Sequence, residues 1–134
     1  MILDSLALAR TAYQAMVRSP ALQDGTPAHS GTDIVKQGLM TKQGGGYKTW
    51  KLRWFVLTPV SLAYYKDRDD DPIDRIILST IDKVEDAFIK TNIHNSLAVG
   101  TPSRTYYMFT ESPQDRDDWL IELRKYVRLA KARF

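Results

Sequence analysis

Apolar side chains follow two different spacings along this chain, and the change falls near residue 33. In residues 1–19 they recur every three or four positions, which is typical of one face of an amphipathic helix. The pattern ends at Ser19-Pro20, and polar and turn-forming residues follow. We therefore predict an N-terminal amphipathic helix and linker over residues 1–33, and a separate domain over residues 34–134. The apolar positions of the helix are Ile2, Leu6, Ala9, Tyr13 and Met16.

Beyond residue 33, apolar residues gather in short segments bounded by turn residues, which is typical of antiparallel strands. Gly44-Gly45-Gly46 and several X-Pro pairs separate these segments, because glycine and proline favour turns over strand interiors. The predicted strands are Val35–Lys42, Lys51–Leu57, Leu62–Lys66, Arg75–Leu78, Lys83–Ile89, Ser96–Val99 and Tyr106–Thr110.

The last segment, "SPQDRDDWLIELRKYVRLAKARF", has the signals of a helix. Ser112 suits the N-cap, Pro113 the first helical position, and Asp115 the positive end of the helix dipole. About seven short strands followed by one amphipathic helix predict an α+β fold, a partly open antiparallel barrel capped by the helix. The apolar stripe that would face the barrel is Trp119, Leu120, Leu123, Tyr126, Val127 and Ala130.

Composition narrows the class of protein. With 134 residues, 43% of them apolar, the chain suits one globular domain with an appendage. It has no cysteine, which excludes disulfides, thiolate zinc sites and cysteine nucleophiles and favours an intracellular protein. Its apolar runs are far shorter than the roughly 20 residues that cross a bilayer. Because the net charge is only +3, an electrostatic partner must be attracted by a local cluster.

Motifs of enzymes are incomplete in this sequence. "GGGYKT" lacks the glycine directly before Lys-Thr that a phosphate-binding P-loop needs, since Tyr47 stands there. "DRDDDP" has Pro72 where a calcium-binding loop needs glycine. His29 and His94 are the only histidines and are far apart in the sequence. We therefore predict no catalytic site, no metal site and no cofactor.

One stretch of the chain has a strong local charge. From Lys36 to Lys66 it carries six cations and no acidic residue. In a strand over Lys51–Leu57, alternation puts Lys51 and Arg53 on the same face as apolar Phe55 and Leu57. That face would run from the core to an open mouth, with Lys42 opposite across the hairpin. Glycines 44–46 would let backbone N–H groups approach an anion. The alternative is a solvated basic hairpin whose aromatic residues belong to the core.

The stretch "GLMTKQGGGYKTWKLRWFVL" resembles the first hairpin of pleckstrin homology (PH) domains that bind 3-phosphorylated phosphoinositides. The family pattern of Lys, loop, Lys/Arg-x-Arg-aromatic-Phe is matched by Lys42, Lys51, Arg53, Trp54 and Phe55. "SLAYYK" is similar to the third strand of the family, and a helix with one Trp, here Trp119, closes its fold. The resemblance covers about residues 35–130 and implies a PH-like barrel.

The resemblance implies roles for particular residues. Lys42 and Arg53 would hold phosphates on either side of an inositol ring, with Lys51 and Lys48 adding charge and Tyr64 donating its hydroxyl. Glycine at position 45 would admit a 3,4,5-trisphosphate as well as a 3,4-bisphosphate headgroup. Further polar contacts are expected from Asn95 and from Arg75, which would replace a basic residue that the family often carries earlier in that strand. The expected membrane contacts are Tyr47 and Lys36.

These residues together predict a non-enzymatic module that binds phosphoinositide headgroups and an anionic membrane surface. Such a module would be cytoplasmic and recruited peripherally to the plasma membrane. The alternative is a PH-fold module that binds a protein partner and has little lipid specificity. Nucleic acid is not an expected partner, because the basic cluster is compact and no longer basic stripe accompanies it.

Overall fold

The computed structural model describes residues 33–46 and 49–133 of the chain. The predicted N-terminal helix and nearly all of the predicted linker lie outside the described residues, as do Tyr47 and Lys48. None of the helices in the described ranges is long and apolar enough to cross a membrane.

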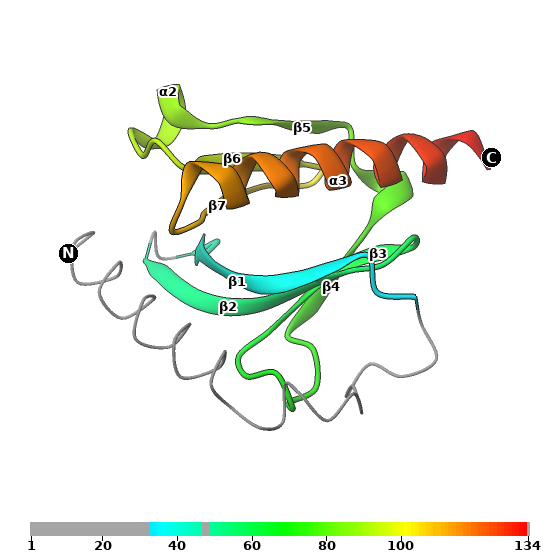
Figure 1. Ribbon diagram of the computed structural model, residues 1–134, viewed down its shortest axis with the longest axis horizontal. Helices are drawn as coiled ribbons and strands as arrows, with labels where there is room; N and C mark the ends of the chain where they lie inside the picture. The colour runs from blue at the N-terminus through cyan, green and yellow to red at the C-terminus, as the bar shows by residue number, and fades with distance from the viewer. Residues whose placement is uncertain (1–32, 47–48, 134) are drawn as a thin grey trace.

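Seven strands form one antiparallel sheet in the order β4-β3-β2-β1-β7-β6-β5. Figure 1 shows the sheet bent around the core, with β1 to β4 on one side and β5 to β7 on the other, next to the C-terminal helix α3. This architecture confirms the predicted antiparallel arrangement of about seven strands with a C-terminal helix. The strands are β1 (Lys36–Gln43), β2 (Trp50–Leu57), β3 (Ser61–Tyr65), β4 (Asp74–Ile77), β5 (Lys83–Asp86), β6 (Ser96–Gly100) and β7 (Thr105–Phe109).

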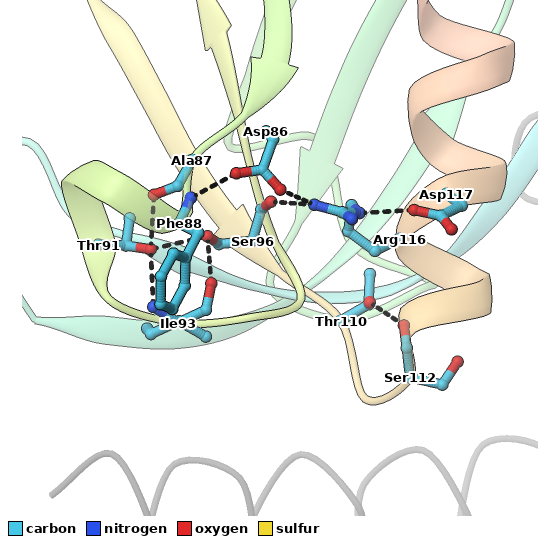
Figure 2. Close-up of polar contacts among 10 residues, drawn as sticks. All are labelled: Asp86, Ala87, Phe88, Thr91, Ile93, Ser96, Thr110, Ser112, Arg116 and Asp117. Carbon is cyan, nitrogen blue, oxygen red and sulfur yellow. Dashed lines mark hydrogen bonds and ion pairs between the residues drawn. The ribbon is translucent and has the colours of Figure 1, made fainter.

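The predicted strand Lys83–Ile89 is too long. Strand β5 ends at Asp86, and residues Phe88–Thr91 form the short helix α2 instead. The Asp86 carboxylate accepts a hydrogen bond from the Phe88 N–H at 2.8 Å (Figure 2), and Asn92 ends the helix with a left-handed φ of 61°. Local side-chain hydrogen bonds of this kind compete with the strand ladder.

The strand predicted over Arg75–Leu78 is displaced by one residue. It runs over Asp74–Ile77 in the structure, and Leu78 begins the short 3-10 helix η2 (Leu78–Thr80). The face that each side chain takes is set by the pairing register with β3, in which Asp74 pairs with Tyr64 and Arg75 with Ala63.

The core fills the space between the bent sheet and helix α3 (Pro113–Ala132). Ser112 caps the helix by accepting a hydrogen bond from the Asp115 N–H at 3.1 Å. The Trp119 ring is fully buried and meets Phe55 edge-on, with ring centroids 6.4 Å apart. Large side chains buried in this way contribute roughly 1.5–3 kcal/mol each. The predicted stripe is confirmed, although Tyr126 is only partly buried; its buried members are Trp119, Leu120, Leu123, Val127 and Ala130.

Side chains of α3 also bind the backbone of the neighbouring strands. Arg116 forms an ion pair with Asp86 and donates to the Ser96 carbonyl at 3.0 Å (Figure 2). Arg124 donates to the Val84 carbonyl of β5 at 3.0 Å. The helix is therefore fixed to β5 and β6 by polar contacts as well as by apolar packing.

Candidate anion-binding site

The β1–β2 hairpin places three cations on the face of the sheet that also carries the core. Lys42 pairs directly with Lys51, and Met40 pairs with Arg53. Because direct partners in an antiparallel pair share a face, Lys42, Lys51 and Arg53 point to the same side as buried Phe55. The face thus changes along β2 from apolar side chains in the core to cations at the open end.

An open cavity of about 270 Å³ lies where these cations converge. Tyr64 of β3 and the glycine turn after β1 are both part of its lining. The lining combines fixed positive charge with backbone that has little side-chain bulk, which suits an anion with several negative groups. The lining residues are Lys42, Gly44, Gly45, Gly46, Thr49, Lys51, Arg53, Tyr64 and Ile73.

Lys42 is held over aromatic rings at the base of the cavity. Its Nζ lies 4.7 Å from the centroid of the Tyr64 ring and 5.9 Å from that of Tyr106, and the residue is 8% exposed. Burial, followed by the charges of Arg104 and Arg53, lowers the pKa of Lys42 from 10.5 to about 8. The ammonium form is therefore destabilised here, and a bound anion would restore it.

Tyr64 lies beside Lys42 and has the opposite shift. Burial, then the nearby Asp74 carboxylate, raises the pKa of the Tyr64 hydroxyl above 10.0, while a hydrogen bond with Arg104 acts the other way. The hydroxyl therefore keeps its proton near neutral pH and can donate a hydrogen bond to an anion.

Arg104 lies beside this cavity, next to Gly45 and Tyr64, although it is not one of the lining residues, and it does not follow from the sequence pattern. It ends the turn between β6 and β7, where the Thr101 hydroxyl donates to its carbonyl at 3.0 Å. Its guanidinium carbon lies 4.2 Å from the Tyr106 ring centroid and 3.1 Å from the position that a Cβ on Gly45 would take. A side chain on Gly45 would push this guanidinium away. Arg104 comes close to Gly45 because β7 pairs with β1, and no short-range motif in the sequence encodes that pairing.

The structure does not bring Arg75 or Asn95 to the cavity. Arg75 pairs with Ala63, whereas Asp74 pairs with Tyr64 and so takes the cavity side of β4. Asn95 donates to the Glu111 carbonyl at 3.3 Å, near the start of α3. The cavity lining includes neither residue.

Lys36 also lies away from the cavity. It stands at the opposite end of β1 from Lys42, paired with Leu57. Its Nζ is 3.0 Å from the Asp115 carboxylate and 5.0 Å from the centroid of the Trp119 ring. No group of three or more His, Cys, Asp or Glu side chains that could hold a metal occurs within residues 33–46 and 49–133.

Known proteins resemble this chain over most of its length. The family model for the PH domain matches residues 34–128. The RAC family serine/threonine-protein kinase homolog of Dictyostelium discoideum is 39% identical over 88 residues, which are 65% of this chain and 20% of that protein. The human dual adapter for phosphotyrosine and 3-phosphotyrosine and 3-phosphoinositide is 29% identical over 136 residues, covering 90% of this chain and 48% of that protein. The chain thus spans less than half the length of either relative.

A solved structure with bound ligand is also similar. It is the C-terminal PH domain of pleckstrin in complex with D-myo-Ins(1,2,3,4,5)P5, which is 29% identical in sequence, with a TM-score of 0.59. The match covers 73% of this chain and 98% of that one.

Proposed function

This chain belongs to the PH domain family, and we propose that it is a phosphoinositide-binding module that recruits its protein to a membrane. The observation that carries the proposal is the convergence of Lys42, Lys51 and Arg53 on one cavity, with Arg104 beside it. Adjacent phosphates on an inositol ring would pair with several of these cations at once. Arginine offers a planar fork to phosphate, and the lysines act as point charges.

The related pleckstrin structure supports the chemical class of ligand, because that domain holds an inositol pentakisphosphate. Lys42 supports it independently. Burial and neighbouring cations lower the pKa of Lys42 to about 8, so they destabilise its charged form. An anion bound beside Lys42 would stabilise that charged form.

We propose further that the preferred headgroups carry a 3-phosphate, as the 3,4,5-trisphosphate or the 3,4-bisphosphate. The bare backbone at Gly45 leaves room beside Arg104 for a phosphate, and the name of the related dual adapter includes 3-phosphoinositide. Lys48 and Tyr47, in the loop beyond the glycines, would add contacts with the bilayer. Recruitment would then be from the cytoplasm to the plasma membrane.

We propose residues 34–134 as the module and residues 1–33 as an N-terminal segment outside it. We assign no catalytic activity to the module. One relative is a kinase homolog, but the match covers only 20% of that protein.

The test is sedimentation with liposomes that contain the 3,4,5-trisphosphate, the 3,4-bisphosphate or the 4,5-bisphosphate lipid. We expect preference for the first two lipids and a loss of about tenfold or more in Arg53→Ala, since a hydrogen bond to a charged group contributes about 1.5–3 kcal/mol. Arg75→Ala is the matched control, because it removes the same charge on the sheet face away from the cavity. Feeble binding to all three lipids that Arg53→Ala leaves unchanged would refute the proposal and favour a protein partner.

A further inference from the structure

The strands β1, β2 and β3 have a second face, away from α3, that is apolar. Its residues alternate with those that face the core, since Trp54 and Val56 flank Phe55, and Ala63 and Tyr65 flank Tyr64. Phe109 of β7 shares this face through its pairing with Thr41. We call this surface the outer face; its buried members are Leu39, Thr41, Trp54, Val56, Ala63, Tyr65 and Phe109, each at most 8% exposed.

An antiparallel sheet with one face on the core normally presents polar side chains on the other. The described helices do not account for the apolar outer face, because α3 packs on η2, β5 and β6, and α2 packs on β6. Among the described residues, the Arg68 side chain lies over the Trp54 ring of this face, with its guanidinium carbon 6.0 Å from the ring centroid. The buried Trp54 indole N–H has no hydrogen-bond partner among the described residues. The described helices therefore do not explain the low exposure of this face.

We propose that the N-terminal amphipathic segment, residues 1–19, folds back and docks its apolar stripe on the outer face of the same chain. The stripe of Ile2, Leu6, Ala9, Tyr13 and Met16 has the composition of such a cover. As a helix it would extend about 21 Å at 1.5 Å per residue. Strand β2, with eight residues, spans about 26 Å at 3.3 Å per residue. The two surfaces have matching lengths.

The direction of the chain favours its own segment as the occupant. Ile34 is packed against the outer face, so the preceding residues reach the domain at the edge of this surface. The linker over residues 21–33 is long enough for the helix to turn back along the strands, because an extended chain covers about 3.3 Å per residue. Because the segment is tethered to the domain, its effective concentration at the outer face is higher than that of a free partner.

The opposite side of such a helix is polar. At about 100° per residue, Asp4, Thr11 and Arg18 would lie about 160–180° from the centre of the apolar stripe and Gln14 about 120° from it, so these side chains would stay in water. The proposal concerns how the sheet is covered and is independent of the lipid-binding function.

The test uses a single introduced thiol, because the chain has no cysteine of its own. Ala63→Cys places a small thiol on the outer face, where Ala63 is 4% exposed. We expect it to react slowly with a maleimide, and to approach the rate of exposed Lys66→Cys when Leu6→Asp and Tyr13→Asp are added. The matched control pair, Thr11→Asp and Gln14→Asp, should leave labelling slow.

Three results would overturn the proposal. The first is rapid labelling of Ala63→Cys without any other change, and the second is slow labelling that persists in the Leu6→Asp, Tyr13→Asp chain. The third is protection that is lost on dilution, which would assign the outer face to a second copy of the chain. Val99→Cys, at a core position that is 0% exposed, reports global unfolding. If this thiol also becomes reactive, the milder change Leu6→Ser replaces the aspartate pair and is judged in the same way.

Discussion

Lys42 and Lys51 are direct cross-strand partners in the β1–β2 hairpin, and both line the same cavity. Favourable cross-strand pairs contribute roughly 0.2–1 kcal/mol to a sheet, and like charges placed directly opposite one another destabilise it by a similar amount. The free protein keeps this repulsion, and a polyanion in the cavity would relieve it. The hairpin is therefore better suited to the ligand than to its own stability.

The first prediction concerns this lysine pair. Lys51→Thr should raise the free energy of unfolding by roughly 0.2–1 kcal/mol at low salt, because it removes the repulsion and keeps a good strand former. The same change should weaken binding of a soluble inositol polyphosphate. Denaturant unfolding and calorimetric titration measure the two effects. Lys83→Thr makes the same replacement in β5, away from the cavity, and should leave binding unchanged. A loss of stability in Lys51→Thr would show that the repulsion is not significant.

The second prediction concerns the contact between Gly45 and Arg104. In Gly45→Ala the new Cβ would lie 3.1 Å from the guanidinium carbon, so Arg104 must move. We expect headgroup affinity to fall several-fold while the melting temperature stays nearly constant, since the end of a long flexible side chain can shift at low cost. Gly38→Ala is the matched control, because its Cβ would meet nothing within 4 Å and Gly38 does not line the cavity. Equal affinities of the two variants would place Arg104 outside the binding site.

The third prediction is a dependence of binding on pH. The pKa of Lys42 is about 8 in the free protein, and a bound polyanion would raise it, so the complex holds more protons than the free components above pH 8. Affinity should therefore fall as the pH rises from 7 to 9.5, by at most about tenfold per pH unit above 8. Phosphate groups are already ionised in this range, and Tyr64, with its pKa raised, remains protonated.

Titration calorimetry in buffers of different ionisation enthalpy checks this prediction through the uptake of protons on binding. Lys42→Arg keeps its charge throughout the range and should abolish the dependence. The free protein should change in the opposite direction. Between about pH 8 and 10.5 the unfolded chain holds more protons at Lys42, so the free energy of unfolding should rise with pH. A flat affinity profile in the unaltered protein would contradict the assignment of Lys42 to the site.

The fourth prediction separates contact with lipid from contact with the headgroup. Ile73 lines the rim of the cavity and is 49% exposed, which places an apolar side chain where a bilayer would meet the domain. Ile73→Ser should weaken binding to liposomes by about tenfold, since burying such a side chain contributes roughly 1.5–3 kcal/mol. Binding of the soluble headgroup should not change, because the replacement adds no charge to the cavity. Ile77→Ser, at a similarly exposed isoleucine of β4 that does not line the cavity, is the control. Equal losses in both variants would argue against insertion at the rim.

Local patterns in the sequence were sufficient for most of the architecture. The alternation in Lys51–Leu57 predicts which side chains of β2 face the core, and the structure agrees. Ser112 and Pro113 likewise mark the start of α3 correctly. These features depend on neighbours within a few residues, which is the range over which sequence periodicity carries information.

What the sequence did not reveal depends on long-range pairing. Arg104 lies beside the cavity because β7 pairs with β1, and the paired residues are 66 to 68 positions apart in the sequence. Arg75 fails to reach it because the register pairs Asp74 with Tyr64, and one residue decides which face a side chain takes. The strand predicted through Ile89 stops at Asp86, where the carboxylate accepts a hydrogen bond from the Phe88 N–H and so favours a turn.

The two edges of the sheet have a consequence for copies of the protein that share one membrane. Strands β4 and β5 are four residues each and carry mostly charged, exposed side chains, and Arg124 already occupies the Val84 carbonyl of β5. Short, charged or covered edges resist pairing with the strands of another molecule. The proposed recruitment would concentrate the protein in two dimensions, where exposed strand edges promote aggregation. Copies of this domain would then crowd on a bilayer without joining into a continuous sheet.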